Sequence, residues 1–155
     1  MIGLLSLVLA IQVDSAKPSL SEMKTWWQVA KAPKWEDYKG KVVIFHTYPS
    51  FCCGWHESME AIKRELERHP KDVRAVSFVY GFMATRDAFN EEIKNLKVNW
   101  PLGVDVDEAF AKKFFPNDMP RYTFTLFDRK GKRLDVVVPS FDQLGKEVDK
   151  VLASN

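Results

Sequence analysis

The stretch "VVIFHTYPSFCCGWHESM", residues 42–59, contains an apolar run, both cysteines of the chain and a histidine. The continuous β-branched and aromatic run over 42–46 predicts a strand that is buried on both faces. The residues after the cysteines predict a helix that runs to about residues 69–70. The two cysteines therefore fall at the start of a helix, where the helix dipole and free N–H groups stabilise a thiolate. This position predicts a chemical role for them rather than a structural cross-link.

The rest of the chain continues the alternation of strands and helices. The patterns predict a short amphipathic helix over 20–32, capped by Ser19 or Ser21, and a turn at Gly40. A second buried strand over 73–81 is followed by helices over 85–98, capped by Thr85, and over 108–115. Residues 121–128 and 133–139 form a hairpin, and a helix capped by Ser140 closes the chain. Crossover helices imply parallel strands, and the hairpin adds antiparallel ones. The sequence therefore predicts an α/β fold with a mixed central sheet and helices on both faces.

Length and composition limit the classes of function. A chain of 155 residues with 46% apolar and 28% charged residues is typical of one soluble globular domain. Its formal net charge of +2 is too small to indicate nucleic acid or an anionic membrane as a partner. We expect a monomer that does not bind nucleic acid.

The first sixteen residues differ from the rest. The run "IGLLSLVLAIQV" is too short to span a bilayer as a helix, and small residues follow it where a signal peptidase can cut, after Ala16. We predict a signal peptide or N-terminal anchor over 1–16 and a single domain over 17–155; the alternative is that the run is a strand or helix of the fold. The protein is then exported, periplasmic or extracellular, and it contacts a membrane only if the segment is retained. In an oxidising compartment, paired thiols tend to form disulfides.

Three segments carry a resemblance to a known family. They are "KGKVVIFHTYP", "WPLGVDVDEAFAKKFF" and "NDMPRYTFTLFDRKGK". Together with the order of elements, they resemble the thioredoxin-like superfamily, and in particular the exported TlpA-like thioredoxins of the cytochrome-maturation type, over about residues 38–153. The resemblance implies a thioredoxin-like fold with an N-terminal helical extension. It also implies that Pro120 is the cis-proline of the fold, with Met119 against the cysteine site, and that Asp105 and Asp107 belong to a strand end and a helix cap.

The cysteine motif departs from that family, whose members carry Cys-x-x-Cys. Either Trp55 or His56 stands in place of the second cysteine, which begins the buried stripe of the helix. Counting four, seven and eleven residues from Trp55 gives Met59, Ile62 and Leu66. Counting from His56 gives Glu60, Lys63 and Glu67, which cannot face a core. Trp55 therefore takes the place of the second cysteine and Cys52 that of the attacking cysteine.

This register predicts a thiol–disulfide oxidoreductase without a cofactor, acting on protein thiols or disulfides. Cys52 attacks, and Cys53 resolves the mixed disulfide because Trp55 cannot. His56, at i+4 from Cys52, lowers the thiol pKa when protonated or serves as a base when neutral. A disulfide between adjacent cysteines is strained, so we expect an oxidant or isomerase rather than a strong reductant. The substrate-binding residues are predicted to be Phe51, Trp55, Met119 and Pro120.

Other functions remain open. The sulfur and imidazole groups of Cys52, Cys53, His56 and Met119 are a donor set that suits Cu(I), and His46 is a further candidate ligand. The segment from Ser50 to Cys53 also resembles the Thr/Ser-x-x-Cys of peroxiredoxins, with Arg121 as the cationic partner. A degenerate, non-catalytic thioredoxin-like binding domain is a further alternative. Structural roles are expected for His69 as a helix C-terminal cap and for Trp26, Trp27, Trp35 and Trp100 in the core.

Overall fold

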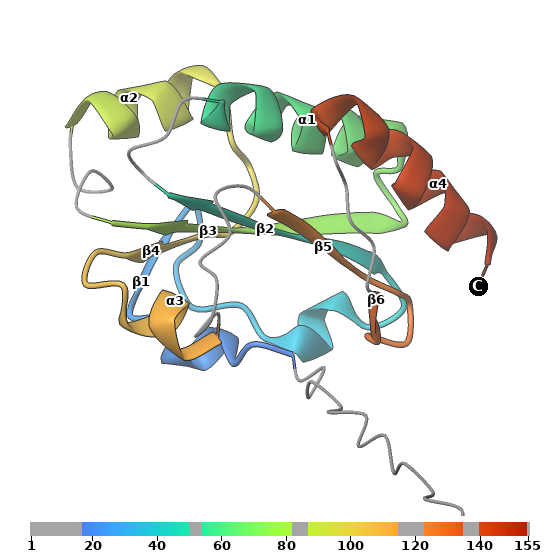
Figure 1. The fold of residues 1–155 in the computed structure, drawn as a ribbon, viewed down its shortest axis with the longest axis horizontal. Coiled ribbons are helices and arrows are strands. Elements are labelled where there is room, and N and C mark those ends of the chain that lie inside the picture. Colours follow the sequence, from blue (N-terminus) through green and yellow to red (C-terminus); the bar gives the residue numbers. More distant parts are fainter. Residues whose placement is uncertain (1–16, 50–53, 82–86, 115–122, 135–139, 155) are drawn as a thin grey trace, which may run out of the picture.

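The computed structural model describes residues 17–49, 54–81, 87–114, 123–134 and 140–154, and these form a six-stranded mixed sheet covered on both faces (Figure 1). The strands are β1 (Thr25–Trp27), β2 (Val42–Pro49), β3 (Val73–Tyr80), β4 (Leu102–Asp105), β5 (Thr123–Phe127) and β6 (Arg133–Leu134). Their order in the sheet is β1-β4-β3-β2-β5-β6. The central strands β2, β3 and β4 are parallel, and β1, β5 and β6 are antiparallel to their neighbours. The predicted mixed sheet is confirmed.

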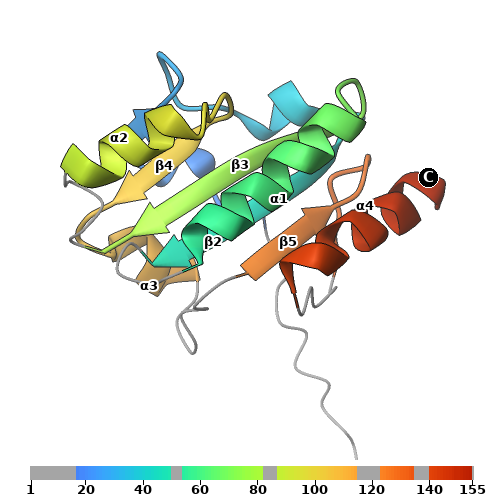
Figure 2. The ribbon, with the colours of Figure 1, turned by 90° about the horizontal axis from the view of Figure 1, so that it is seen from above.

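The helices divide into two layers (Figures 1 and 2). One face of the sheet, the α1 face, is covered by α1 (Trp55–Arg68), α2 (Asp87–Asn95) and α4 (Leu144–Ala153), and the short η4 (Phe141–Gln143) leads into α4. The opposite face, the α3 face, is covered by α3 (Ala109–Phe114) and by two 3₁₀ helices, η1 (Leu20–Glu22) and η2 (Trp35–Tyr38). Every residue of β2 is buried, as expected of a strand with helices on both sides.

The α3 face packs mainly through aromatic rings. Phe127 lies with its ring centroid 4.7 Å from that of Trp35 and 6.4 Å from that of Phe45. Phe78 and Phe110 form a second pair, 4.7 Å apart. Large rings bury much apolar area with few rotatable bonds, so these contacts contribute strongly to stability.

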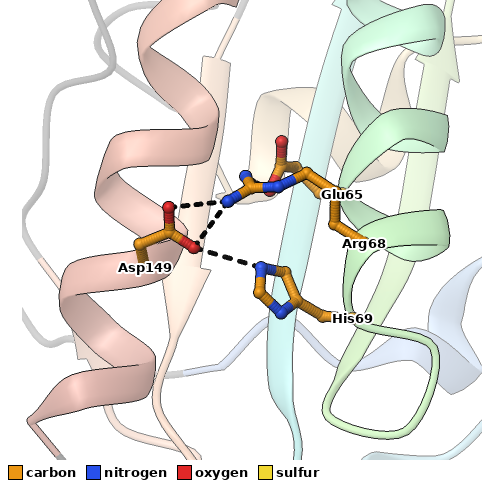
Figure 3. Close-up of polar contacts among 4 residues, drawn as sticks. All are labelled: Glu65, Arg68, His69 and Asp149. Carbon is orange, nitrogen blue, oxygen red and sulfur yellow. Dashed lines mark hydrogen bonds and ion pairs between the residues drawn. The ribbon is translucent and has the colours of Figure 1, made fainter.

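The α1 face carries a polar cluster that joins α1 to α4, in which Glu65 is buried and Arg68, His69 and Asp149 reach the surface (Figure 3). The Arg68 guanidinium donates to Glu65 Oε2 at 2.7 Å and to both Asp149 oxygens at 3.0 and 2.8 Å. His69 Nε2 lies 3.1 Å from Asp149 Oδ1. Hydrogen bonds from Arg68 lower the pKa of Asp149. Residue 145 of α4 has to be small here, because a β-carbon on Gly145 would lie 2.8 Å from Glu65 Oε1.

The segment over 20–32 is not the predicted amphipathic helix. Only η1 is helical, and β1 then pairs antiparallel with β4, with Thr25 opposite Val104 and Trp27 opposite Leu102. On a strand, neighbouring side chains point to opposite faces, so Trp26 packs on the α3 face and Trp27 on the α1 face. A helix in place of β1 would leave the edge of β4 without its antiparallel partner.

The other predicted elements are present among the described residues, and β2 runs three residues further than predicted, to Pro49. Gly40 turns with a φ of 77°, α2 covers 87–95, and β5 and β6 form the expected hairpin. Ser140 precedes η4 rather than α4, and its side chain makes no capping hydrogen bond, because the chain enters α4 through a 3₁₀ turn. His69 is the C-cap of α1, as predicted. Thr85 and residues 1–16, with the predicted signal peptide, lie outside the described residues.

Candidate functional site

The junction between β2 and α1 is the centre of the predicted site. β2 ends at Pro49 and α1 begins at Trp55, so Cys52 and Cys53 precede the helix directly in the chain. Gly54 is the N-cap, with a left-handed φ of 100°. Glycine adopts this conformation without the steric penalty that a β-carbon would add. The sequence Cys-Cys-Gly-Trp therefore places its glycine where the backbone requires one.

Most of the predicted site residues cannot be placed. Phe51, Cys52, Cys53, Met119 and Pro120 lie outside the described residues, and Ser50 and Arg121 do as well. Their predicted roles, including the cis-proline at 120, stay predictions. Trp55 and His56 are described, and they test the register of α1.

The predicted helix register is confirmed. Met59 and Ile62 are buried in the core of the α1 face, and Trp55 and Leu66 are half-buried and pack against the same core. In the alternative register, His56 and Glu67 are exposed. Trp55 thus starts the buried stripe of α1, and its ring lies 6.2 Å from that of Tyr48 on β2.

His56 lies on the outer side of the first turn of α1. Its side chain is exposed, and its ring meets the Trp55 ring edge-on at a centroid distance of 6.2 Å. This exposed position at the N-terminus of α1 is accessible to a partner molecule. Whether His56 acts on Cys52, as predicted, stays a prediction.

A second histidine lies beneath the helix. His46, on β2, is 1% exposed, and its ring stacks on that of Phe124 at a centroid distance of 5.1 Å. Its Nδ1 lies 3.3 Å from the hydroxyl of Ser77, its neighbour on β3. Its Nε2 is buried and has no hydrogen-bond partner among the described residues. Of the described residues, His46 therefore presents the one buried imidazole below α1.

The contacts of Ser77 determine which nitrogen of His46 carries the proton. Trp100 Nε1 donates to Ser77 Oγ at 2.8 Å, and the Ser77 hydroxyl donates to Met59 Sδ at 3.7 Å. A hydroxyl has one proton and two lone pairs. All three contacts are satisfied together only if His46 Nδ1 donates to Ser77, which leaves Nε2 unprotonated. Burial also lowers the pKa of His46 to about 3, so the ring is neutral at physiological pH.

The similarity of this chain to known proteins lies in its fold. The sequence matches no family model and no curated protein. Among solved structures, a thioredoxin-like protein in the oxidized form superposes with a TM-score of 0.70 at 20% identity, over 89% of this chain and 95% of that one. A thiol-disulfide isomerase from Corynebacterium glutamicum gives 0.67 at 22% identity, over 92% and 99%. A secreted Mycobacterium tuberculosis disulfide oxidoreductase homologous to E. coli DsbE gives 0.56 at 14% identity, over 74% and 85%. The chain has the thioredoxin-like fold.

Within this thioredoxin-like fold, several predicted structural roles are confirmed. Asp105 ends β4, and its Oδ2 accepts the N–H of Ala111 at 2.9 Å. Asp107 Oδ1 accepts the N–H of Ala109 at 3.3 Å at the start of α3, which lowers the pKa of Asp107. The predicted tryptophans lie in or against the two cores. No group of three or more potential metal ligands occurs among the described residues, a set that does not include either cysteine.

Sequence reasoning missed the polar chain of Met59, Ser77, Trp100 and His46. One signal was present in the sequence, because His46 interrupts an otherwise apolar strand. The sequence suggests His46 only as a candidate copper ligand, and the structure adds that its Nδ1 lies within hydrogen-bond distance of Ser77. The partner could not be found from sequence, because Ser77 is 31 residues away and becomes a neighbour only through the pairing of β2 with β3.

Proposed function

We propose that the protein is an exported thiol–disulfide oxidoreductase whose redox group is the pair Cys52 and Cys53. The main support is the confirmed register of α1: its buried stripe starts at Trp55, and the cysteine pair immediately precedes the helix N-terminus. Solved structures with the same fold include a thiol-disulfide isomerase and a secreted disulfide oxidoreductase. Because Trp55 has no thiol, Cys53 is the resolving group.

The proposed exchange proceeds in two steps. A thiolate of a substrate protein attacks Cys52 Sγ of the Cys52–Cys53 disulfide, which forms a mixed disulfide and releases Cys53 as a thiolate. A second substrate thiolate then attacks the substrate sulfur of the mixed disulfide and releases Cys52. Two electrons and two protons pass from the substrate dithiol to the protein, and a disulfide such as oxidised glutathione restores the starting state. The helix N-terminus favours each step that leaves Cys52 as a thiolate.

His56 is proposed to stabilise the Cys52 thiolate from the exposed side of the first turn of α1. A protonated imidazole one turn away lowers the pKa of a thiol by electrostatic attraction. Replacing His56 with Gln should therefore shift the pH dependence of Cys52 alkylation to higher pH. His69→Gln is the matched control, because His69 lies at the opposite end of α1 and bonds to Asp149.

The deciding experiment is intact mass measurement, with and without thiol alkylation, on protein purified without reductant. A denatured mass two hydrogens light, resistant to alkylation until reduced, is expected. Cys53→Ser should then abolish turnover. In this variant the Cys52 thiolate can still attack a substrate disulfide, and the mixed disulfide should persist because Cys53 is needed to resolve it in this direction; Cys52→Ser should trap nothing. Two free thiols with a copper-sized mass increment only under native conditions would replace this proposal with Cu(I) binding. Two free thiols without metal, unchanged by mild oxidant, would indicate a non-catalytic domain.

A further inference from the structure

The end of the sheet opposite the cysteine junction collects positive charge. Three loops meet where β2 and β3 begin and β5 ends: residues 39–41, residues 71–72 and the hairpin turn 128–132. We call these loops, together with Lys17, the basic end. Its cations are Lys17, Lys39, Lys41, Lys71, Arg129, Lys130 and Lys132.

Direct contacts join the parts of the basic end. The N–H of Gly40 donates to the Arg129 carbonyl at 3.2 Å, and Lys41 Nζ donates to the Lys71 carbonyl at 2.6 Å. The Lys17 ammonium lies over the Trp35 ring, 5.6 Å from its centroid. It also approaches Gly131 so closely that a β-carbon there would be 2.2 Å from Lys17 Nζ. These loops, distant in sequence, therefore form one surface.

Three carboxylates of this region, those of Asp72, Asp128 and Asp37, have partners within the chain. Asp72 pairs with Arg129 at 2.9 Å, and Asp128 Oδ1 accepts the N–H groups of residues 130 and 132 at 2.9 and 2.8 Å. Asp37, on the adjoining η2, accepts the N–H of Lys34 at 2.9 Å. In contrast, the side chains of Lys39, Lys71 and Lys130 are exposed, and none has an ion pair with a described carboxylate. The outward charge of the basic end is therefore positive.

The imbalance is large relative to the whole chain. The basic end contains seven cations and two carboxylates, Asp72 and Asp128. The adjoining η2 adds two more carboxylates, Glu36 and Asp37. With all four carboxylates counted, this end of the molecule carries a net charge of +3. Since the chain as a whole carries +2, all other residues together carry −1. The small net charge thus conceals a separation of charge between one end of the molecule and the rest.

We infer that the basic end docks on an anionic phospholipid surface. Lys17 belongs to it and directly follows residues 1–16, which contain the apolar run 2–13 and are, in this inference, a retained anchor rather than a cleaved signal peptide. One short apolar segment binds a bilayer only marginally, and a polybasic surface next to it supplies the second attraction that stable binding requires. The apolar run and the basic end are adjacent in the chain at Lys17. This adjacency favours lipid head groups over an acidic protein as the binding partner of the basic end.

Docking in this way orients the redox site. β2 has eight residues, and at about 3.3 Å per residue its last residue lies about 23 Å from its first. The bilayer would contact the amino ends of β2 and β3, so the junction at residues 49–54 would face away from the membrane, accessible to soluble proteins. Among the described residues no helix is both long and apolar enough to cross a bilayer.

Vesicle co-sedimentation of the full chain tests this inference. Vesicles of phosphatidylcholine alone are compared with vesicles that contain phosphatidylserine, at low and at high salt. The patch variant is Lys39→Gln/Lys71→Gln/Lys130→Gln. The matched control, Lys24→Gln/Lys63→Gln/Lys146→Gln, removes the same charge from the segment before β1, from α1 and from α4.

The expected result is that the wild type and the control bind the anionic vesicles at least tenfold more tightly than the neutral ones. The patch variant should lose most of this preference, since each lysine at an anionic surface contributes about a fivefold factor at low salt. If both variants lost the preference for anionic vesicles equally, the preference would depend only on the net charge of the protein, and the inference would be wrong. Equal binding of the wild type to both vesicle types would also overturn it and would leave an acidic protein as the partner to seek. The experiment does not depend on the cysteines, so its outcome is separate from that of the proposed function.

Discussion

The two faces of the sheet are built from different chemistry. On the α3 face, β2 and β3 present Phe45 and Phe78 to a layer of rings that includes Trp35, Phe110 and Phe127. On the α1 face, the same two strands present His46 and Ser77, which bond to each other beneath α1. Every residue of β2 is buried, whichever face its side chain points to, so burial does not distinguish the two faces.

The difference shows where the molecule accepts the cost of burying polar groups. An aromatic layer needs only shape and area, and any ring that fills it stabilises the fold. A buried imidazole and a buried carboxylate each need a specific partner, because desolvation without one is unfavourable. These groups lie on the face that also carries the N-terminus of α1, next to the cysteines in the chain. The ring layer of Trp35, Phe45 and Phe127 contains no titratable group, so its contribution to stability should be insensitive to pH, whereas that of the buried His46 should not.

The largest effect is expected on the aromatic face. Phe127→Ala removes a buried ring that contacts Trp35 and Phe45, and it should lower the free energy of unfolding by about 3–5 kcal/mol. Urea unfolding at pH 7 and pH 5 measures the difference between variant and wild type, which should be the same at both values. A loss that changes with pH would break the contrast between the faces.

The next-largest change in stability is expected from the protonation of His46, on the α1 face. Its pKa is about 3 in the folded protein and about 6.5 when unfolded, so the unfolded chain binds the proton more tightly. The stability contributed by neutral His46 is complete above pH 6.5 and is lost as pH falls toward 3. Over this range the free energy of unfolding falls by about 1.4 kcal/mol per pH unit, so about 2–3 kcal/mol of stability is lost by pH 4.5.

His46→Leu should remove this slope, and its stability relative to the wild type should rise by that amount between pH 7 and pH 4.5. Urea unfolding at intervals of half a pH unit is the measurement. Ser77→Ala is the control, because it removes the hydrogen bond to Nδ1 but keeps the imidazole, and should retain the slope. Parallel pH curves for His46→Leu and the wild type would mean that His46 is not buried as a neutral ring.

The smallest effect is expected at the cluster between α1 and α4. Glu65 is buried, and Glu65→Ala removes its charge-assisted hydrogen bond to Arg68, at an expected loss of about 2 kcal/mol. The comparison variant is Asp142→Asn, which breaks an exposed pair with Arg64 at 3.9 Å and should change stability by less than about 0.5 kcal/mol. Thermal unfolding of the two variants at pH 7 measures both. Equal losses would show that burial adds nothing to the Glu65 pair.

Most of the correct predictions about the fold came from patterns among residues that are close together in the sequence. The periodicity of α1 identified Trp55, Met59 and Ile62 as its buried stripe, because side chains four and seven residues apart share one side of a helix. The same local patterns predicted β2, β3 and the hairpin. They failed over residues 20–32, where the helical pattern of the segment is overridden by pairing with β4, some eighty residues further along the chain.

The sequence by itself determined the strand–helix alternation, the position of the cysteine pair before α1 and the turn at Gly40. These are consequences of local sterics and side-chain spacing, which a few neighbouring residues specify. Tertiary structure alone decided that Ser77 and Trp100 reach His46, that Asp149 reaches Arg68, and that lysines from four separate segments form one basic end. Such contacts depend on which strands pair and in which register, and that choice is made by the free energy of the whole core rather than by any one segment.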